Sequence, residues 1–191
     1  PNELQVKFAY APGSNASVSS SNSSNATDVA TVTDSTMVRV TAVPVEGALI
    51  RVSYMESDAG AGVISNEQKA QSGAIAATYN YGSFAFGLGR SYVAPVLADG
   101  STDRIESTEN TNYSVGFNVN DNLSVSYTNE ESQNENTTAG TVTEELDVSS
   151  VQAAYTMGGM TVAIAASDYD NVGYAKGVNV SEVILAVTMA F

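Results

Sequence analysis

The chain has 191 residues, enough for one all-β domain, and its 21 acidic against 7 basic residues give a formal net charge of −14. This balance argues against a nucleic-acid partner, which requires a basic surface, and against attraction to anionic lipid headgroups by charge alone. Cys and His are both absent, which excludes disulfides, thiol chemistry, structural zinc and imidazole catalysis. No apolar run is long enough for a transmembrane helix.

Residues 3–10 introduce a pattern that recurs along the chain. Every second residue is apolar, namely Leu4, Val6, Phe8 and Tyr10. A period of two predicts a β-strand with one apolar face. The preceding Pro1-Asn2 is typical of a tight turn inside a longer protein, and neither an initiating Met nor a signal peptide is present. We therefore expect a processed or incomplete polypeptide.

Nine further segments alternate in the same way, so the sequence predicts ten strands. The nine cover residues 36–43, 48–55, 74–79, 84–89, 113–119, 123–127, 151–155, 160–164 and 183–191. Short turns are expected near residues 45, 81, 121 and 158, and long polar loops over 11–35, 56–71, 94–110, 129–145 and 167–177. Short turns at one rim and long loops at the other are typical of an antiparallel up-and-down transmembrane β-barrel. The sequence thus predicts one all-β barrel domain over residues 1–191.

The last strand gives the strongest indication of a membrane. Its apolar face runs to the final residue and comprises Val183, Leu185, Val187, Met189 and Phe191, whereas a soluble domain usually frays into a polar terminus. Aromatic residues are expected in two girdles at the water–hydrocarbon boundaries, with Tyr10, Tyr54 and Tyr113 at the long-loop rim and Tyr79, Tyr155 and Phe191 at the short-turn rim. A soluble β-sandwich also alternates, but it predicts neither the regular turn lengths nor the apolar end.

Three stretches carry a resemblance to a known family. They are Gly116-Phe-Asn-Val-Asn-Asp-Asn-Leu-Ser-Val-Ser-Tyr127, Ala154-Tyr-Thr-Met-Gly-Gly-Met-Thr-Val162 and Ala186-Val-Thr-Met-Ala-Phe191. The chain resembles the C-terminal part of Gram-negative general porins, especially those of the α-proteobacterial type. The resemblance implies a homotrimer of sixteen-stranded barrels in the outer membrane, in contact with lipid and lipopolysaccharide. It also implies that Val187, Met189 and Phe191 belong to a C-terminal assembly signal.

The chain departs from this family by lacking six N-terminal strands and the loop that folds inward to narrow the pore. Either these parts are missing here, which we prefer, or the chain is a genuine ten-stranded barrel. Barrel diameter grows with strand number, so ten strands enclose too little space for a broad aqueous channel.

Three basic residues have the parity of the pore-lining face on the first three strands, namely Lys7, Arg39 and Arg51. At about 3.3 Å per residue, Arg39 and Arg51 lie roughly 13–17 Å from the short-turn rim, near mid-height. Such a basic ladder would hold a positive potential across the lumen, and the resemblance implies that it belongs to the basic wall of a pore constriction. The alternative is that these charges are merely solvated.

The same face of the next hairpin is nearly bare, because it carries Ala74, Ala76, Ala85, Gly87 and Gly89. Either the pore is wider there or another segment packs against the wall, and we expect an inward-folded segment. Most acidic residues fall in or beside the long loops, where they would attract cations to an acidic vestibule. No spacing typical of a calcium loop occurs, so we expect no metal site.

The sequence therefore predicts an outer-membrane porin through which ions and small hydrophilic solutes diffuse passively, without a cofactor. An enzyme is not expected, because outer-membrane barrel hydrolases resemble one another in using a His base, and the chain has none. Two alternatives stay open: a non-channel β-rich surface or structural module, adhesive or virion-associated, and a small ten-stranded barrel without an open pore.

Overall fold

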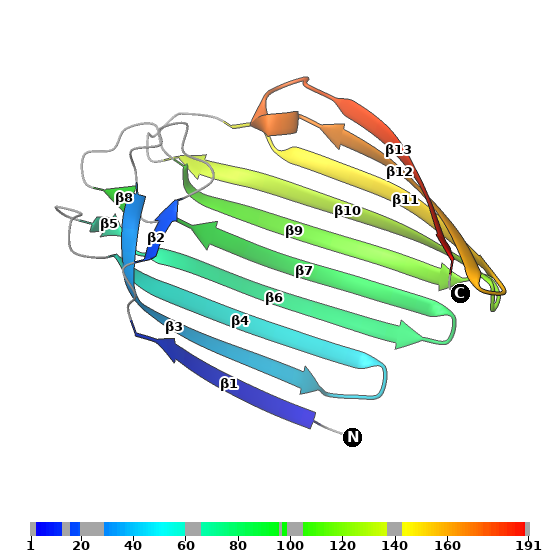
Figure 1. Cartoon of the computed structure of the whole chain (residues 1–191), viewed down its shortest axis with the longest axis horizontal. Helices are drawn as coiled ribbons and strands as arrows, with labels where there is room; N and C mark the ends of the chain where they lie inside the picture. The colour runs from blue at the N-terminus through cyan, green and yellow to red at the C-terminus, as the bar shows by residue number, and fades with distance from the viewer. Residues whose placement is uncertain are drawn as a thin grey trace.

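A single antiparallel sheet dominates the computed structural model, which describes residues 3–12, 16–19, 29–59, 66–95, 97–98, 105–136 and 143–189 (Figure 1). Its ten strands are β1 (Glu3–Ala11), β3 (Val29–Val43), β4 (Ala48–Ala59), β6 (Ala70–Tyr81), β7 (Phe84–Ala94), β9 (Ile105–Asn118), β10 (Leu123–Asn136), β11 (Leu146–Met157), β12 (Met160–Asp170) and β13 (Val180–Met189). Each pairs with the next, which confirms the predicted ten-stranded up-and-down order.

Three short strands and one helical turn complete the described elements. The strand β2 (Ala16–Ser19) pairs with β3, and β5 (Asn66–Gln68) pairs with β8 (Leu97–Ala98) in a separate two-stranded sheet. The 3₁₀ turn η1 (Val172–Tyr174) lies in the connection between β12 and β13. None of these short strands was expected from the sequence, which has no clear alternation over so few residues.

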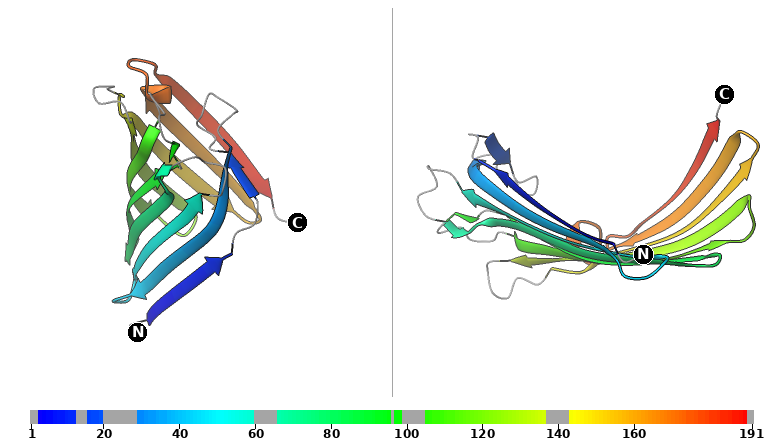
Figure 2. Two further views of the ribbon diagram at one scale, coloured as in Figure 1. Left: turned by 90° about the vertical axis from the view of Figure 1, so that its left-hand side faces the viewer. Right: turned by 90° about the horizontal axis from the view of Figure 1, so that it is seen from below.

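The sheet is not closed into the predicted barrel. It bends into an open trough with β1 and β13 as its two edges (Figure 2). Bulges sharpen the bending of a sheet, and in the ten-stranded path the register shifts only near the long-loop ends, between Val32 and Ser35 and between Glu135 and Asn136. The remaining strands pair in continuous register, and the twist summed over ten strands does not bring the two edges together.

The strands extend further toward the long loops than the sequence indicated. The expected loops over 129–145, 94–110 and 167–177 are wrong in part, because residues 129–136, 105–110 and 167–170 are strand. Polar cross-strand hydrogen bonds support these extensions, for example from the Thr108 hydroxyl to Asn134 Oδ1 at 2.7 Å. Residues 29–35 and 56–59 likewise extend β3 and β4.

The short turns lie where they were expected. Gly47, Gly82 and Gly158 have positive φ of 82°, 58° and 61°, a conformation that glycine adopts without a steric penalty. The turn between β9 and β10 contains no glycine, and its Asn120 Oδ1 instead accepts hydrogen bonds from the backbone N–H groups of Asn122 and Leu123, both at 2.9 Å.

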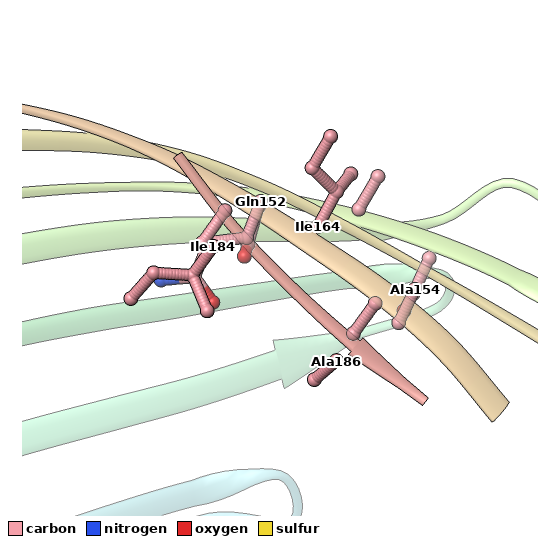
Figure 3. Close-up of a pocket in the computed structure, with 10 residues that line it drawn as sticks. Gln152, Ala154, Ile164, Ile184 and Ala186 are labelled. Atoms are coloured by element: carbon pink, nitrogen blue, oxygen red, sulfur yellow. The ribbon is translucent and has the colours of Figure 1, made fainter. Parts of the chain in front are cut away.

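The continuous registers keep each parity on one face across the whole sheet. Val162 pairs with Val187 and Ile164 with Leu185 on one face, while Ala163 pairs with Ala186 on the other. Residues of the second parity form most of the lining of a hollow over β10–β13 (Figure 3). The face that carries Ala163 and Ala186 is therefore the concave face. Most of the exposed large apolar side chains therefore lie on the convex face, and mainly small or polar ones line the trough. In the described strands, the exposed large apolar residues with concave parity are Met37, Met55, Val93, Val180 and Ile184.

Burial in this sheet is the reverse of that in a soluble domain. Among the described residues the one buried apolar residue is Ala94, whereas the buried polar residues are Ser57, Asn129, Ser132, Asn134 and Ser167. Leu4 and Phe8 on the convex face are 71% and 79% exposed. No second layer covers the convex face within the described part of the chain.

Candidate functional site

The three basic residues singled out from the sequence lie together on the concave face of β1, β3 and β4. Lys7 and Arg39 are direct cross-strand partners, and Arg39 pairs in turn with Ser53, two residues from Arg51. Directly opposed side chains have Cβ atoms about 5 Å apart and diagonal neighbours about 7–8 Å apart. Lys7, Arg39 and Arg51 therefore form one contiguous group, called the basic row below.

The basic row has no counter-charge in the described part of the protein. The ion pairs found there involve Lys69, Arg90 and Lys176 instead. Like charges opposite one another in a sheet are destabilising, and here no neighbouring carboxylate offsets the repulsion. The row is exposed to the trough, so its positive potential extends into the space that the sheet encloses.

The small-residue wall adjoins the basic row. Its members lie on the concave face of β6 and β7 and are Ala74, Ala76, Ala85, Gly87 and Gly89. Arg51 pairs with Ala76, and Ala76 pairs with Gly89. The long Arg51 side chain thus stands beside a low wall and has free space on that side.

Side chains from β9 lie over the two glycines of this wall. A Cβ on Gly89 would come within 2.7 Å of Asn112 Oδ1, and a Cβ on Gly87 within 2.5 Å of Ser114 Oγ. The absence of side chains at Gly87 and Gly89 therefore leaves room for the side chains of Ser114 and Asn112 on β9. The three alanines are exposed, so the expected inward-folded segment does not cover them within the described residues.

A hollow of about 200 Å³ lies over β10–β13, on the opposite flank of the trough from the basic row (Figure 3). In Figure 3 Gln152, Ile184 and Ala186 lie on one side of the ribbons and Ile164 on the other. The lining is neutral and mostly small, so it offers space but no chemistry. This hollow was not expected from the sequence, although the alternate alanines Ala163 and Ala165 indicate it.

The convex face carries the residues expected to meet hydrocarbon. Tyr113 and Tyr127 lie together toward the middle of β9 and β10, with ring centroids 6.4 Å apart, whereas Phe84 and Phe117 meet near the short turns, at 4.7 Å. The described part of the proposed assembly signal, Val187 and Met189, pairs with Val162 and Met160 on this face. Phe191 lies outside the described residues.

Polar groups replace apolar ones on the convex face beyond the tyrosines. Lys69 Nζ is 3.0 Å from Glu56 Oε1 and 2.7 Å from Asp58 Oδ1, and Arg90 pairs with Glu109. Hydrogen bonds to Asp58 and Glu56 raise the pKa of Lys69 well above its ordinary value. Several acidic residues expected in loops thus lie on strand ends and take part in ion pairs.

Some kinds of site are not found in the described residues. No group of three or more Asp or Glu there is arranged to hold a metal ion. The part of the chain that the structure describes contains no helix long and apolar enough to cross a membrane. The sequence contains no His and no Cys.

Comparison with known proteins adds no family to this description. No protein-family model matches the sequence, and no curated protein is similar enough to count as a relative.

Proposed function

We propose that the chain forms part of the wall of an outer-membrane porin, through which ions and small hydrophilic solutes pass down their gradients. The observation that carries this proposal is the division of the sheet into two faces. Its convex face exposes large apolar side chains on every strand of the path except β3, while the trough carries mainly polar and small residues. A membrane barrel with a water-filled lumen needs this arrangement.

The exposure of large apolar side chains on the convex face supports a lipid environment. Leu4, Phe8, Val183 and Leu185 are each at least 67% exposed, and full burial of such a side chain is worth about 1.5–3 kcal/mol. Soluble monomers rarely expose contiguous apolar patches larger than a few hundred Å². Hydrocarbon around the convex face would remove this cost at all these positions together.

The two unpaired edges support a wall that other strands complete. The strand β1 runs from the short-turn rim toward the long loops, and β13 runs in the opposite direction. Further strands could therefore pair antiparallel with the free edges of β1 and β13. Within the resemblance to porins, six further strands would give a sixteen-stranded barrel, and three such barrels would form the native trimer.

A first experiment tests the membrane environment. The full-length protein should partition into the outer membrane, require detergent for purification and produce ion conductance in planar bilayers. A protein that is monodisperse without any amphiphile, and that gives no conductance, would contradict the proposal and favour the non-channel surface module.

A second experiment tests the role of the basic row. Replacing Arg39 and Arg51 by Ala should shift the reversal potential of the channel toward cation preference, because the positive potential in the lumen falls. The matched control is Arg90→Ala, which removes a cation from the convex face. An equal shift in both variants, or none in either, would contradict the assignment of the basic row to the pore.

A further inference from the structure

The connection between β12 and β13, residues 171–179, is a compact folded segment. The backbone N–H of Val172 donates to Val178 O at 2.7 Å, and that of Gly177 donates to Asn171 Oδ1 at 2.9 Å. The described part of the chain contains two non-glycine residues with positive φ, Asn171 at 58° and Tyr174 at 60°, and both lie here. Asn tolerates this conformation, but a bulky Tyr adopts it rarely. An interaction elsewhere must therefore hold Tyr174 in place.

That interaction joins Tyr174 to a strand two positions away in the sheet. Its hydroxyl lies 2.8 Å from Ser132 Oγ, on β10, and Ser132 is only 5% exposed. The strand β11 separates β10 from β12. Ser132 has the same parity as Ser124 and Ser126, which line the concave hollow. The side chain of Tyr174 therefore reaches past the end of β11 to β10 on the concave side of the sheet.

Two further contacts fasten the same segment to the chain that precedes β11. Asn171 Nδ2 donates to the backbone oxygen of Glu145 at 2.9 Å, and Lys176 Nζ lies 3.4 Å from Glu144 Oε1. The contacts of Asn171, Tyr174 and Lys176 fix the segment at three points. It is thus anchored over the long-loop end of the trough, beyond the open hollow on the same flank.

We propose that residues 171–179 are a fixed lid over the long-loop mouth of the channel, and that Tyr174 is the residue that sets how much of the mouth is open. This inference rests on the channel function proposed above. The lid obstructs the flank formed by β10–β12, so solutes enter along the other flank, where the basic row lies. Tyr174 is in this sense a specificity-determining residue, although it is far from the basic row in the sequence.

Accessibility of Ser132 tests the lid without reference to conductance. The chain has no Cys, so Ser132→Cys in the full-length protein introduces a single thiol, and Ser126→Cys on the same strand and face provides the open control. A charged, membrane-impermeant thiol reagent should label position 132 about tenfold more slowly than position 126, because labelling follows exposure. Adding Tyr174→Ala should bring the two rates together, whereas equal rates before that change would overturn the lid.

Conductance then tests the role of the lid in permeation. Tyr174→Ala and the milder Tyr174→Phe, which loses only the hydroxyl, should raise single-channel conductance, by up to about twofold for Ala. Tyr155→Phe is the matched control, since Tyr155 lies on the convex face, where it pairs with Leu123 and Val162, and does not contact the lid. Conductance that Tyr174→Ala leaves unchanged would overturn the lid alone. Absence of conductance in the unaltered protein would overturn the channel function itself.

Discussion

The two faces of β12 provide the sharpest test of the solvent around the sheet. Ile164 occupies the middle of the convex row that runs from Met160 to Asp168, about 13 Å along the strand from Met160. Its neighbour Ala165 points into the trough and lines the hollow. Ile164→Arg and Ala165→Arg therefore place the same charge one residue apart on opposite faces.

The expected magnitudes separate a lipid environment from an aqueous one. Arg near the middle of the lipid-facing band of a β-barrel costs about 2–4 kcal/mol. In water, Ile164 is already 47% exposed, so its replacement would lose only about half of the 1.5–3 kcal/mol that full burial of an apolar side chain supplies. Ala165→Arg should cost less than about 0.5 kcal/mol, as substitutions at open surfaces usually do.

Equilibrium urea titrations of folding into phospholipid vesicles measure these costs. Ile164→Ala is the additional control, because it removes the apolar side chain without adding a charge and so separates lost packing from the burial of Arg. The convex Arg should lower the free energy of unfolding by at least about 2 kcal/mol more than the concave one. Equal losses, or a larger loss for Ala165→Arg, would refute the assignment of the convex face to hydrocarbon.

Two further predictions concern local structure. Gly47→Ala should lower the free energy of unfolding by about 1–3 kcal/mol, more than Gly158→Ala does. The reason is that a Cβ at Gly47 would collide with the backbone oxygen of Asn80, whereas Gly158 has open space around it. Equal losses of the two variants in a urea titration would contradict this prediction. Lys69→Gln should lower the unfolding temperature slightly and equally at pH 6 and pH 9. A raised pKa means that the contribution of Lys69 is complete below the ordinary lysine pKa of about 10.4 and is lost only as the pH rises through the folded-state value; a loss that disappears by pH 9 would contradict that direction.

Alternation made the strands predictable because each residue's face follows from its parity alone. The pattern of Leu4, Val6 and Phe8 therefore identified β1, and the same argument placed Lys7, Arg39 and Arg51 on one face. The ends of the strands were not predictable in this way. Around Thr108 and Asn134 both faces are polar, so the sequence lacks alternation although the strands continue to pair.

Features that depend on distant residues stayed out of reach of the sequence. The contact between Ser132 and Tyr174 joins positions 42 residues apart, and no local pattern indicates it. Closure of the sheet into a barrel could not be predicted from a local pattern either, because the curvature of a sheet sums small twists and bulges over many strands. The alternation is the same in an open trough and in a closed barrel, so it predicted the strand order correctly and could not determine whether β1 and β13 meet.

In the proposed channel, selectivity would depend on how charge is distributed over the concave face. The basic row occupies one flank of the trough, on β1, β3 and β4, whereas Glu130 and Glu182 have concave parity on β10 and β13. Fixed charges of opposite sign on two flanks create a transverse field that draws anions to one side and cations to the other. While both flanks are charged, such a field discriminates only weakly between anions and cations. Loss of Arg39 and Arg51 should leave the acidic flank dominant and so favour cations. In the proposed porin, a strand that paired with the free edge of β1 would lie beside Lys7, so its charges would decide whether the basic row is balanced or reinforced.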